Sequence, residues 1–129
     1  MNSERRSGVL LVSVFPQAHA MLLQALRSRG ISVAIARSGR LALRKLRLNP
    51  VVVLVDLVYG PALDPESIAQ LNAVRSSATV LGLHDGDLGK FADELDELVM
   101  DGFFRASDWF PVIELAAESL HQVTEARRN

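Results

Sequence analysis

Five short apolar runs recur along the chain, and each is followed by a stretch in which apolar and polar residues alternate at helical spacing. The runs are rich in Val, Leu and Ile and are bounded by Gly, Pro, Asn or Asp, which is typical of β-strands. The run at 51–57 has no polar residue before Asp56, so we expect a central parallel strand covered on both faces. The strands predicted in this way are residues 8–15, 31–36, 51–57, 79–83 and 102–105.

Capping residues delimit the stretches between these runs. Ser38 and Asp64 each precede a predicted helix, and Pro65 follows Asp64 at the first helical position. Gly30 follows the first amphipathic stretch as a helix stop, and Asn49-Pro50 follows the second. The expected helices are residues 17–29, 38–48, 64–75 and 88–100, with a last one that starts at Ser107 or Asp108 and has Pro111 in its first turn.

Alternation of strand and helix five times predicts an α/β fold, a doubly wound five-stranded parallel sheet with helices on both faces and right-handed crossovers. We expect one domain over residues 8–125, a disordered tail at 1–7 and a short tail at 126–129. In folds of this class, ligands bind at the C-terminal edge of the sheet. Residues that end the strands are therefore the candidates for function.

The composition of the 129 residues narrows the function classes. Without cysteine there is neither a disulfide framework nor a thiolate metal site, and no apolar run is long enough for a membrane span. We expect a cytoplasmic protein that does not associate with a membrane.

The net charge of −1 hides a segregation of charge along the chain. Residues 5–55 contain nine basic and no acidic residues, whereas residues 56–129 contain fourteen acidic and five basic residues. If the halves fold to opposite sides, the molecule is an electric dipole. The charges then either face water on two helix surfaces, steer a charged partner, or support head-to-tail self-association.

Asp56 is the one carboxylate that ends a predicted buried strand. An acidic side chain there would cost several kcal/mol if it were buried without a partner. It is either a structural residue that caps loop amides or a site residue. The other residues at the expected edge are Ser13, Val14, His84, Asp85, Arg105, Ala106 and Ser107.

Several segments match one family at consistent spacing. The run VVVLVDL resembles the third strand of response-regulator receiver domains, in which the terminal Asp accepts a phosphoryl group. Also similar are the first-strand run VLLV, the Asp64-Pro65 helix start and the Asp101-Gly102-Phe103 entry into the fifth strand. The resemblance covers nearly the whole chain and implies the flavodoxin-like (βα)5 fold of receivers, a role in two-component signalling or a phosphorelay, and Asp56 as the phosphoacceptor equivalent.

The sequence departs from this family where the chemistry occurs. Receivers have two acidic residues after the first strand that help to hold Mg²⁺, and here Ser13 and Val14 replace them. The switch Ser or Thr aligns with His84, and the switch Lys aligns with Arg105 or, without a gap, with Ala106. Asp56 with a Ser13 hydroxyl is a poor Mg²⁺ site, so we expect phosphorylation to be very slow. Arg105 could instead form a permanent ion pair with Asp56.

Other residue clusters fit simpler explanations than a functional site. His84, Asp85 and Asp87 favour turn and cap chemistry over a metal site, and Ser13, His84 and Asp56 lack the Gly-x-Ser-x-Gly motif of a hydrolase. No Gly-rich loop follows the first strand, which disfavours nucleotide binding. The basic second helix has no interleaved aromatic residues, so nucleic acid is not expected. His19 and His121 are expected on the surface, whereas Phe104, Trp109 and Phe110 could belong to a partner face or to the core.

Three functions remain open at this stage. The first is an atypical receiver, or pseudo-receiver, that is not an enzyme, holds no metal or other cofactor, and binds a signalling kinase, a downstream effector or a second copy through its fourth helix, fifth strand and fifth helix. The second is a genuine phosphoacceptor that uses Asp56 with Mg²⁺ as cofactor. The third is a small α/β enzyme or nucleotide binder.

Overall fold

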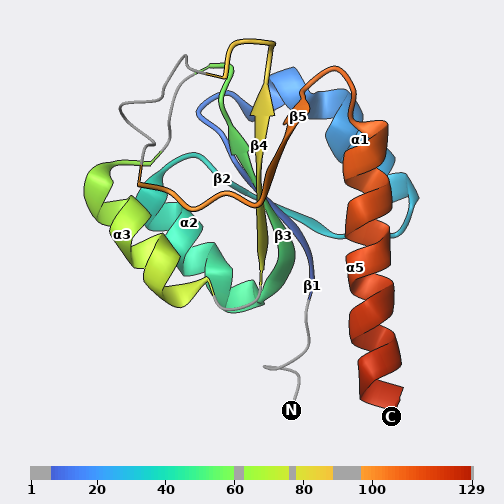
Figure 1. The fold of residues 1–129 in the computed structure, drawn as a ribbon. Coiled ribbons are helices and arrows are strands. Elements are labelled where there is room, and N and C mark those ends of the chain that lie inside the picture. The colour runs from blue at the N-terminus through green and yellow to red at the C-terminus, as the bar shows by residue number, and fades with distance from the viewer. Residues whose placement is uncertain (1–6, 60–62, 76–77, 89–96, 129) are drawn as a thin grey trace.

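A five-stranded parallel sheet forms the centre of the computed structural model, which describes residues 7–59, 63–75, 78–88 and 97–128 (Figure 1). The strand order is β2-β1-β3-β4-β5, and every pair of neighbours is parallel. This confirms the predicted doubly wound α/β fold. The strands are β1 (Ser7–Val12), β2 (Val33–Ala36), β3 (Pro50–Asp56), β4 (Thr79–His84) and β5 (Gly102–Arg105).

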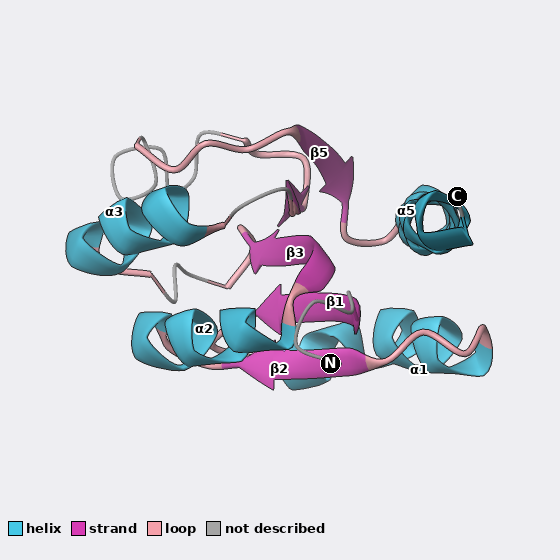
Figure 2. Ribbon diagram, turned by 90° about the horizontal axis from the view of Figure 1, so that it is seen from below, coloured by secondary structure: helices cyan, strands magenta, loops and turns pink. Residues whose placement is uncertain are grey.

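Helices cover both faces of the sheet (Figure 2). The helices α1 and α5 lie on one face, while α2 and α3 lie on the other, next to each other. Along the sheet, α1 and α2 flank the end at β2, and α3 and α5 lie toward the end at β5. The helical elements are η2 (Pro16–His19), α1 (Ala20–Ser28), α2 (Gly39–Lys45), η3 (Leu46–Leu48), α3 (Pro65–Val74) and α5 (Phe110–Arg128).

The two central strands supply side chains to two separate cores because successive residues of a strand point to opposite faces. In β1, Val9 and Leu11 pack with α1 and α5, whereas Leu10 and Val12 pack with α2 and α3. Every residue of β3 is buried. The prediction of a central strand covered on both faces is therefore confirmed.

The predicted caps are present at the starts of α2 and α3. The Ser38 hydroxyl accepts a hydrogen bond from the Leu41 amide at 3.2 Å, and the Asp64 carboxylate accepts one from the Ser67 amide at 2.7 Å. Each satisfies one of the unpaired N–H groups in the first helical turn. At Gly39 in the first turn of α2, an added Cβ would lie 2.1 Å from Ser67 Oγ, so glycine is what lets α2 and α3 approach this closely.

Several element boundaries differ from the prediction. The first helix begins as the 3-10 turn η2, and α2 ends at Lys45, followed by η3. The last helix, α5, begins at Phe110 and not at Ser107 or Asp108, and it continues to Arg128. Of the helix expected at 88–100, residues 97–100 are not helical, and 89–96 lie outside the described residues.

In the part of the chain that the structure describes, no helix combines the length and the apolar character that crossing a membrane requires.

Candidate functional site

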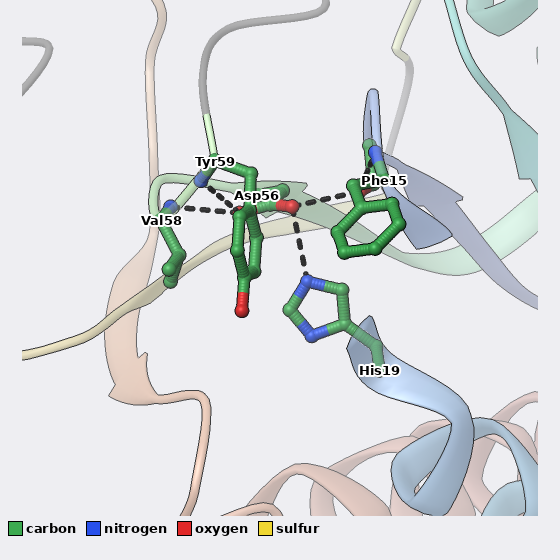
Figure 3. A network of polar contacts seen from close by, with 6 residues as sticks. Phe15, His19, Asp56, Val58 and Tyr59 are labelled. Carbon is green, nitrogen blue, oxygen red and sulfur yellow. Dashed lines mark hydrogen bonds and ion pairs between the residues drawn. The ribbon is translucent and has the colours of Figure 1, made fainter. Parts of the chain in front are cut away.

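Asp56 ends β3 at the centre of the C-terminal edge of the sheet, and it is almost completely buried, with 1% of its surface exposed. Four protein groups donate hydrogen bonds to its carboxylate (Figure 3). Oδ2 accepts from Ser13 Oγ at 2.7 Å and lies 3.0 Å from His19 Nε2. Oδ1 accepts from the backbone amides of Val58 at 2.7 Å and Tyr59 at 3.2 Å. Asp56 therefore caps loop amides, which is the structural role considered from the sequence, and it lies at the C-terminal edge of the sheet.

Ser13 and His19 reach Asp56 because β1 and β3 are neighbours in the sheet. Ser13 follows the last residue of β1, and its hydroxyl also accepts a hydrogen bond from the Phe15 amide at 3.0 Å. Pro16 then begins η2, and this single 3-10 turn directs the last residue, His19, back over the end of β3.

The prediction that His19 lies on the surface is wrong, since only 4% of this residue is exposed. The periodic pattern placed it on a continuous helix that starts at Gln17, whereas it is in a separate turn before α1. One sequence signal was available: a buried carboxylate needs a partner, and His19 is the histidine in the segment that follows the neighbouring strand.

These contacts fix the charge state of the carboxyl. Burial of Asp56 raises its pKa, but the hydrogen bonds from His19, Ser13 and Val58 outweigh that effect, so the pKa lies below the ordinary value of 3.8. Asp56 is therefore ionised at neutral pH. Because a carboxylate only accepts hydrogen bonds, His19 Nε2 must carry a proton.

An aromatic pair lies at the mouth of the site. The rings of Phe15 and Tyr59 meet edge to face with their centroids 5.3 Å apart, and Tyr59 also lies edge to face with His19 at 6.2 Å. Phe15 and Tyr59 are each about half exposed, as is Val14. Partly exposed apolar side chains therefore lie next to the residues that hold Asp56.

The residues present do not fit the Mg²⁺ ion of a working receiver. Mg²⁺ is bound by oxygen ligands, usually one or two carboxylates with water. Within the described residues, no second carboxylate takes part in the hydrogen-bond network of Asp56, whose oxygens accept protein hydrogen bonds from groups that include the Ser13 hydroxyl and His19 Nε2. Among the described residues, no group of three or more His, Cys, Asp or Glu could hold a metal ion.

The positions aligned with the receiver switch contact groups other than Asp56. His84 Nδ1 accepts a hydrogen bond from the Gly86 amide at 2.9 Å, which makes His84 part of the turn after β4. The Arg105 guanidinium lies over Gly86, because a Cβ built there would meet its Nη1 at 3.1 Å. The expected ion pair between Asp56 and Arg105 is not among those in the described part of the chain, where His19 takes that place. Ala106 packs against the core formed with α1 and α5.

Two further interpretations are decided by the geometry. Asp85 Oδ1 accepts from the Asp87 amide at 3.2 Å, so the predicted turn chemistry in this segment is confirmed, whereas the helix that it was expected to cap lies outside the described residues. In a hydrolase, the serine hydroxyl would donate its hydrogen bond to a histidine, but Ser13 donates to Asp56, and His84 Nδ1 accepts from the Gly86 amide. Ser13, Asp56 and His84 therefore do not form a catalytic triad.

The aromatic residues near the start of α5 divide between core and surface. Phe104 and Trp109 are partly buried against the core formed with α1 and α5. Phe110 is 61% exposed, and Phe103 on β5 is 48% exposed. The last predicted surface histidine, His121, is exposed on α5, as expected.

Comparison with known proteins gives relatives in fold only. No protein-family model and no curated protein sequence matches the chain. Among solved structures, it is similar to the signal receiver domain of a putative LuxO repressor protein from Vibrio parahaemolyticus, with 16% identity, a TM-score of 0.67 and coverage of 95% of each chain. It is also similar to the receiver domain of an HD domain-containing protein from Pseudomonas fluorescens, with 22% identity, a TM-score of 0.69 and coverage of 97% of this chain and 95% of that one.

A third similar structure is the receiver domain of a modulated diguanylate cyclase from Desulfovibrio desulfuricans, with 27% identity, a TM-score of 0.63 and coverage of 91% of this chain and 95% of that one. The resemblance deduced from the sequence is therefore confirmed at the level of the fold.

Proposed function

We propose that this chain, which has the fold of response-regulator receiver domains, acts in signal transduction as a protein–protein interaction module, without enzymatic activity and without Mg²⁺-dependent phosphorylation. The observation that carries the proposal is the state of Asp56. Both of its oxygens accept hydrogen bonds from the protein, and the residue is almost fully buried.

Phosphoryl transfer to Asp56 would require a carboxylate oxygen to become free. The oxygen Oδ2 accepts from Ser13 and His19, and each hydrogen bond to a charged group contributes roughly 1.5–3 kcal/mol. Loss of both would add about 3–6 kcal/mol to the barrier, which slows the reaction by roughly two to four orders of magnitude. The absence of the acidic pair adds to this, because Mg²⁺ supplies much of the charge neutralisation in phosphoryl transfer.

Exposed apolar side chains at the β5 end of the sheet support a role in binding. Val99 precedes β5, Phe103 lies on it, and Phe110 begins α5, and each is about half exposed or more. Burial of such apolar side chains by a partner removes them from water, which favours binding. A signalling kinase, a downstream effector or a second copy of the chain would bind there.

The first experiment tests phosphorylation. The purified protein is incubated with Mg²⁺ and acetyl phosphate, or with beryllofluoride, and is followed by intact mass and by amide chemical shifts. We expect neither an adduct nor shifts around Asp56, and the Asp56→Asn variant should give the same result as the parent. A stoichiometric adduct that is absent from Asp56→Asn would overturn the proposal and establish the phosphoacceptor function.

The second experiment tests the interaction face. Phe103→Glu places a charge on exposed β5, and Met21→Glu places the same charge on an exposed position of α1. Capture of partners from native lysate by the parent should be lost with Phe103→Glu and kept with Met21→Glu. Equal capture by all three proteins would exclude the β5 face.

A further inference from the structure

An arginine stripe lies along the outer side of α2 and the residues that flank it. It comprises Arg37, Arg40, Arg44 and Arg47, all of which are exposed. Arg40 and Arg44 are four residues apart on α2, which places them on one side of the helix, and Arg47 follows in η3. The opposite side of α2 packs into the core through Ala42. No ion pair of the described part of the chain involves any of the four arginines.

The fold separates the two charged halves of the sequence. The basic half forms β1, β2 and β3 with α1 and α2, and the strand order places β2 at one end of the sheet. The acidic half forms β4 and β5 with α3 and α5 and occupies the other end (Figure 2). Exposed carboxylates there include Glu97, Asp108 and Glu118. The condition that the sequence left open, namely that the halves fold to opposite sides, is met for these elements.

We infer that the arginine stripe binds the acidic β5 end of a second copy of this chain, so that copies associate head to tail. Opposite charge in one molecule makes each end complementary to the far end of another copy. The net charge of −1 does not oppose the approach of identical molecules, since overall repulsion is small. This inference rests on the proposed function in one respect, because the β5 end is also the binding face proposed above, and it names a second copy of the chain as the partner. A parent that stays monomeric but still captures other proteins from lysate through Phe103 would refute the inference and leave the proposed function standing.

The surroundings of the stripe favour a protein over nucleic acid. A cavity of about 210 Å³ lies beside the end of α2, and its lining residues are Val9 and Leu10 of β1, residues 32–34 at the start of β2, and Lys45, Leu48 and Pro50. It is mainly apolar and has no aromatic ring, so it suits an aliphatic or aromatic side chain of a protein better than a stacked base. The β5 end carries exposed apolar side chains next to its carboxylates, whereas a nucleic acid offers phosphates alone along its backbone.

Two sets of substitutions test this arrangement in the full chain. The basic-end variant carries Arg40→Gln, Arg44→Gln and Arg47→Gln, and the acidic-end variant carries Glu97→Gln, Asp108→Asn and Glu118→Gln. Each variant keeps one charged end. Combined, the six substitutions keep the net charge at −1, which separates the effect of the dipole from that of net charge. Circular dichroism verifies that all variants are folded.

Sedimentation velocity over a range of protein concentrations gives the readout. At about 20 mM salt the parent should form concentration-dependent oligomers, and at about 0.5 M salt it should be monomeric, because screening shortens the reach of the charges. Each variant alone and the sixfold variant should be monomeric at both salt concentrations. An equimolar mixture of the two single-end variants should form dimers and nothing larger, since each supplies only one competent end.

Three results would overturn the inference. One is a parent that is monomeric at low salt and high concentration. Another is a sixfold variant that associates like the parent. The third is a monomeric parent that binds a single-stranded or duplex oligonucleotide with an affinity that falls at least tenfold in the basic-end variant, which would assign the stripe to nucleic acid.

Discussion

Replacement of His19 by phenylalanine is the sharpest test of the buried network around Asp56. The ring keeps a similar size and apolar contacts, but the hydrogen bond to Oδ2, 3.0 Å long, is lost. Hydrogen bonds to charged groups contribute roughly 1.5–3 kcal/mol, and Asp56 remains buried with Ser13 and two amides as donors. We therefore expect the free energy of unfolding to fall by about 2 kcal/mol.

Urea denaturation measures this loss. With a slope of roughly 1–3 kcal/mol per M, the midpoint should fall by about 1 M. A double-mutant cycle with Asp56→Asn isolates the pair, and we expect a coupling free energy between about 1 and 3 kcal/mol, because the two side chains are in direct contact. Additive effects of the two substitutions, together with a loss below about 0.5 kcal/mol for His19→Phe, would refute the network as a stabilising element.

Three further outcomes follow from the described contacts. The pKa of Asp56 is lower in the folded protein than in the unfolded chain, so its charge stabilises the fold above pH 3.8, and this contribution is lost as the pH falls through the folded pKa. The difference in stability between the parent and Asp56→Asn should therefore be constant above about pH 5 and shrink below it. Denaturation curves in which this difference stays constant down to about pH 2 would contradict this expectation. Gly39→Ala should destabilise the protein by about 1–3 kcal/mol through the clash with Ser67, and Ser67→Gly in the same chain should recover part of that loss. Equal thermal stability of the parent and Gly39→Ala would show that α2 and α3 shift freely. Arg75, at the end of α3, donates hydrogen bonds to the carbonyl of Val99 and, at 2.7 Å, to the Asp101 carboxylate ahead of β5. Arg75→Gln should therefore increase amide exchange in residues 97–101, while β1 and β3 stay protected. Unchanged exchange in residues 97–101 would show that these contacts do not hold the segment.

The order of elements and their two-sided burial could be predicted from the sequence because they depend on local patterns. The apolar run at the third strand and the caps Ser38 and Asp64 each report on a few neighbouring residues. The position of Asp56 at the sheet edge follows from the same patterns, since the carboxyl ends of parallel strands share one edge. The absence of an acidic pair at Ser13 and Val14 is likewise a fact of the sequence.

The partners of Asp56 were decided by the tertiary structure. Whether a histidine after the first strand faces solvent or a carboxylate on the third depends on strand order and on a single 3-10 turn, neither of which leaves a periodic signal. The same holds for Arg105. Its match to the switch Lys of receivers predicted an ion pair with Asp56, but its guanidinium lies over Gly86. The sequence alone determined which chemical groups reach the edge of the sheet. Only the packing of distant segments determined which of them meet, because the contacts between Ser13, His19 and Asp56 join residues that are far apart along the chain.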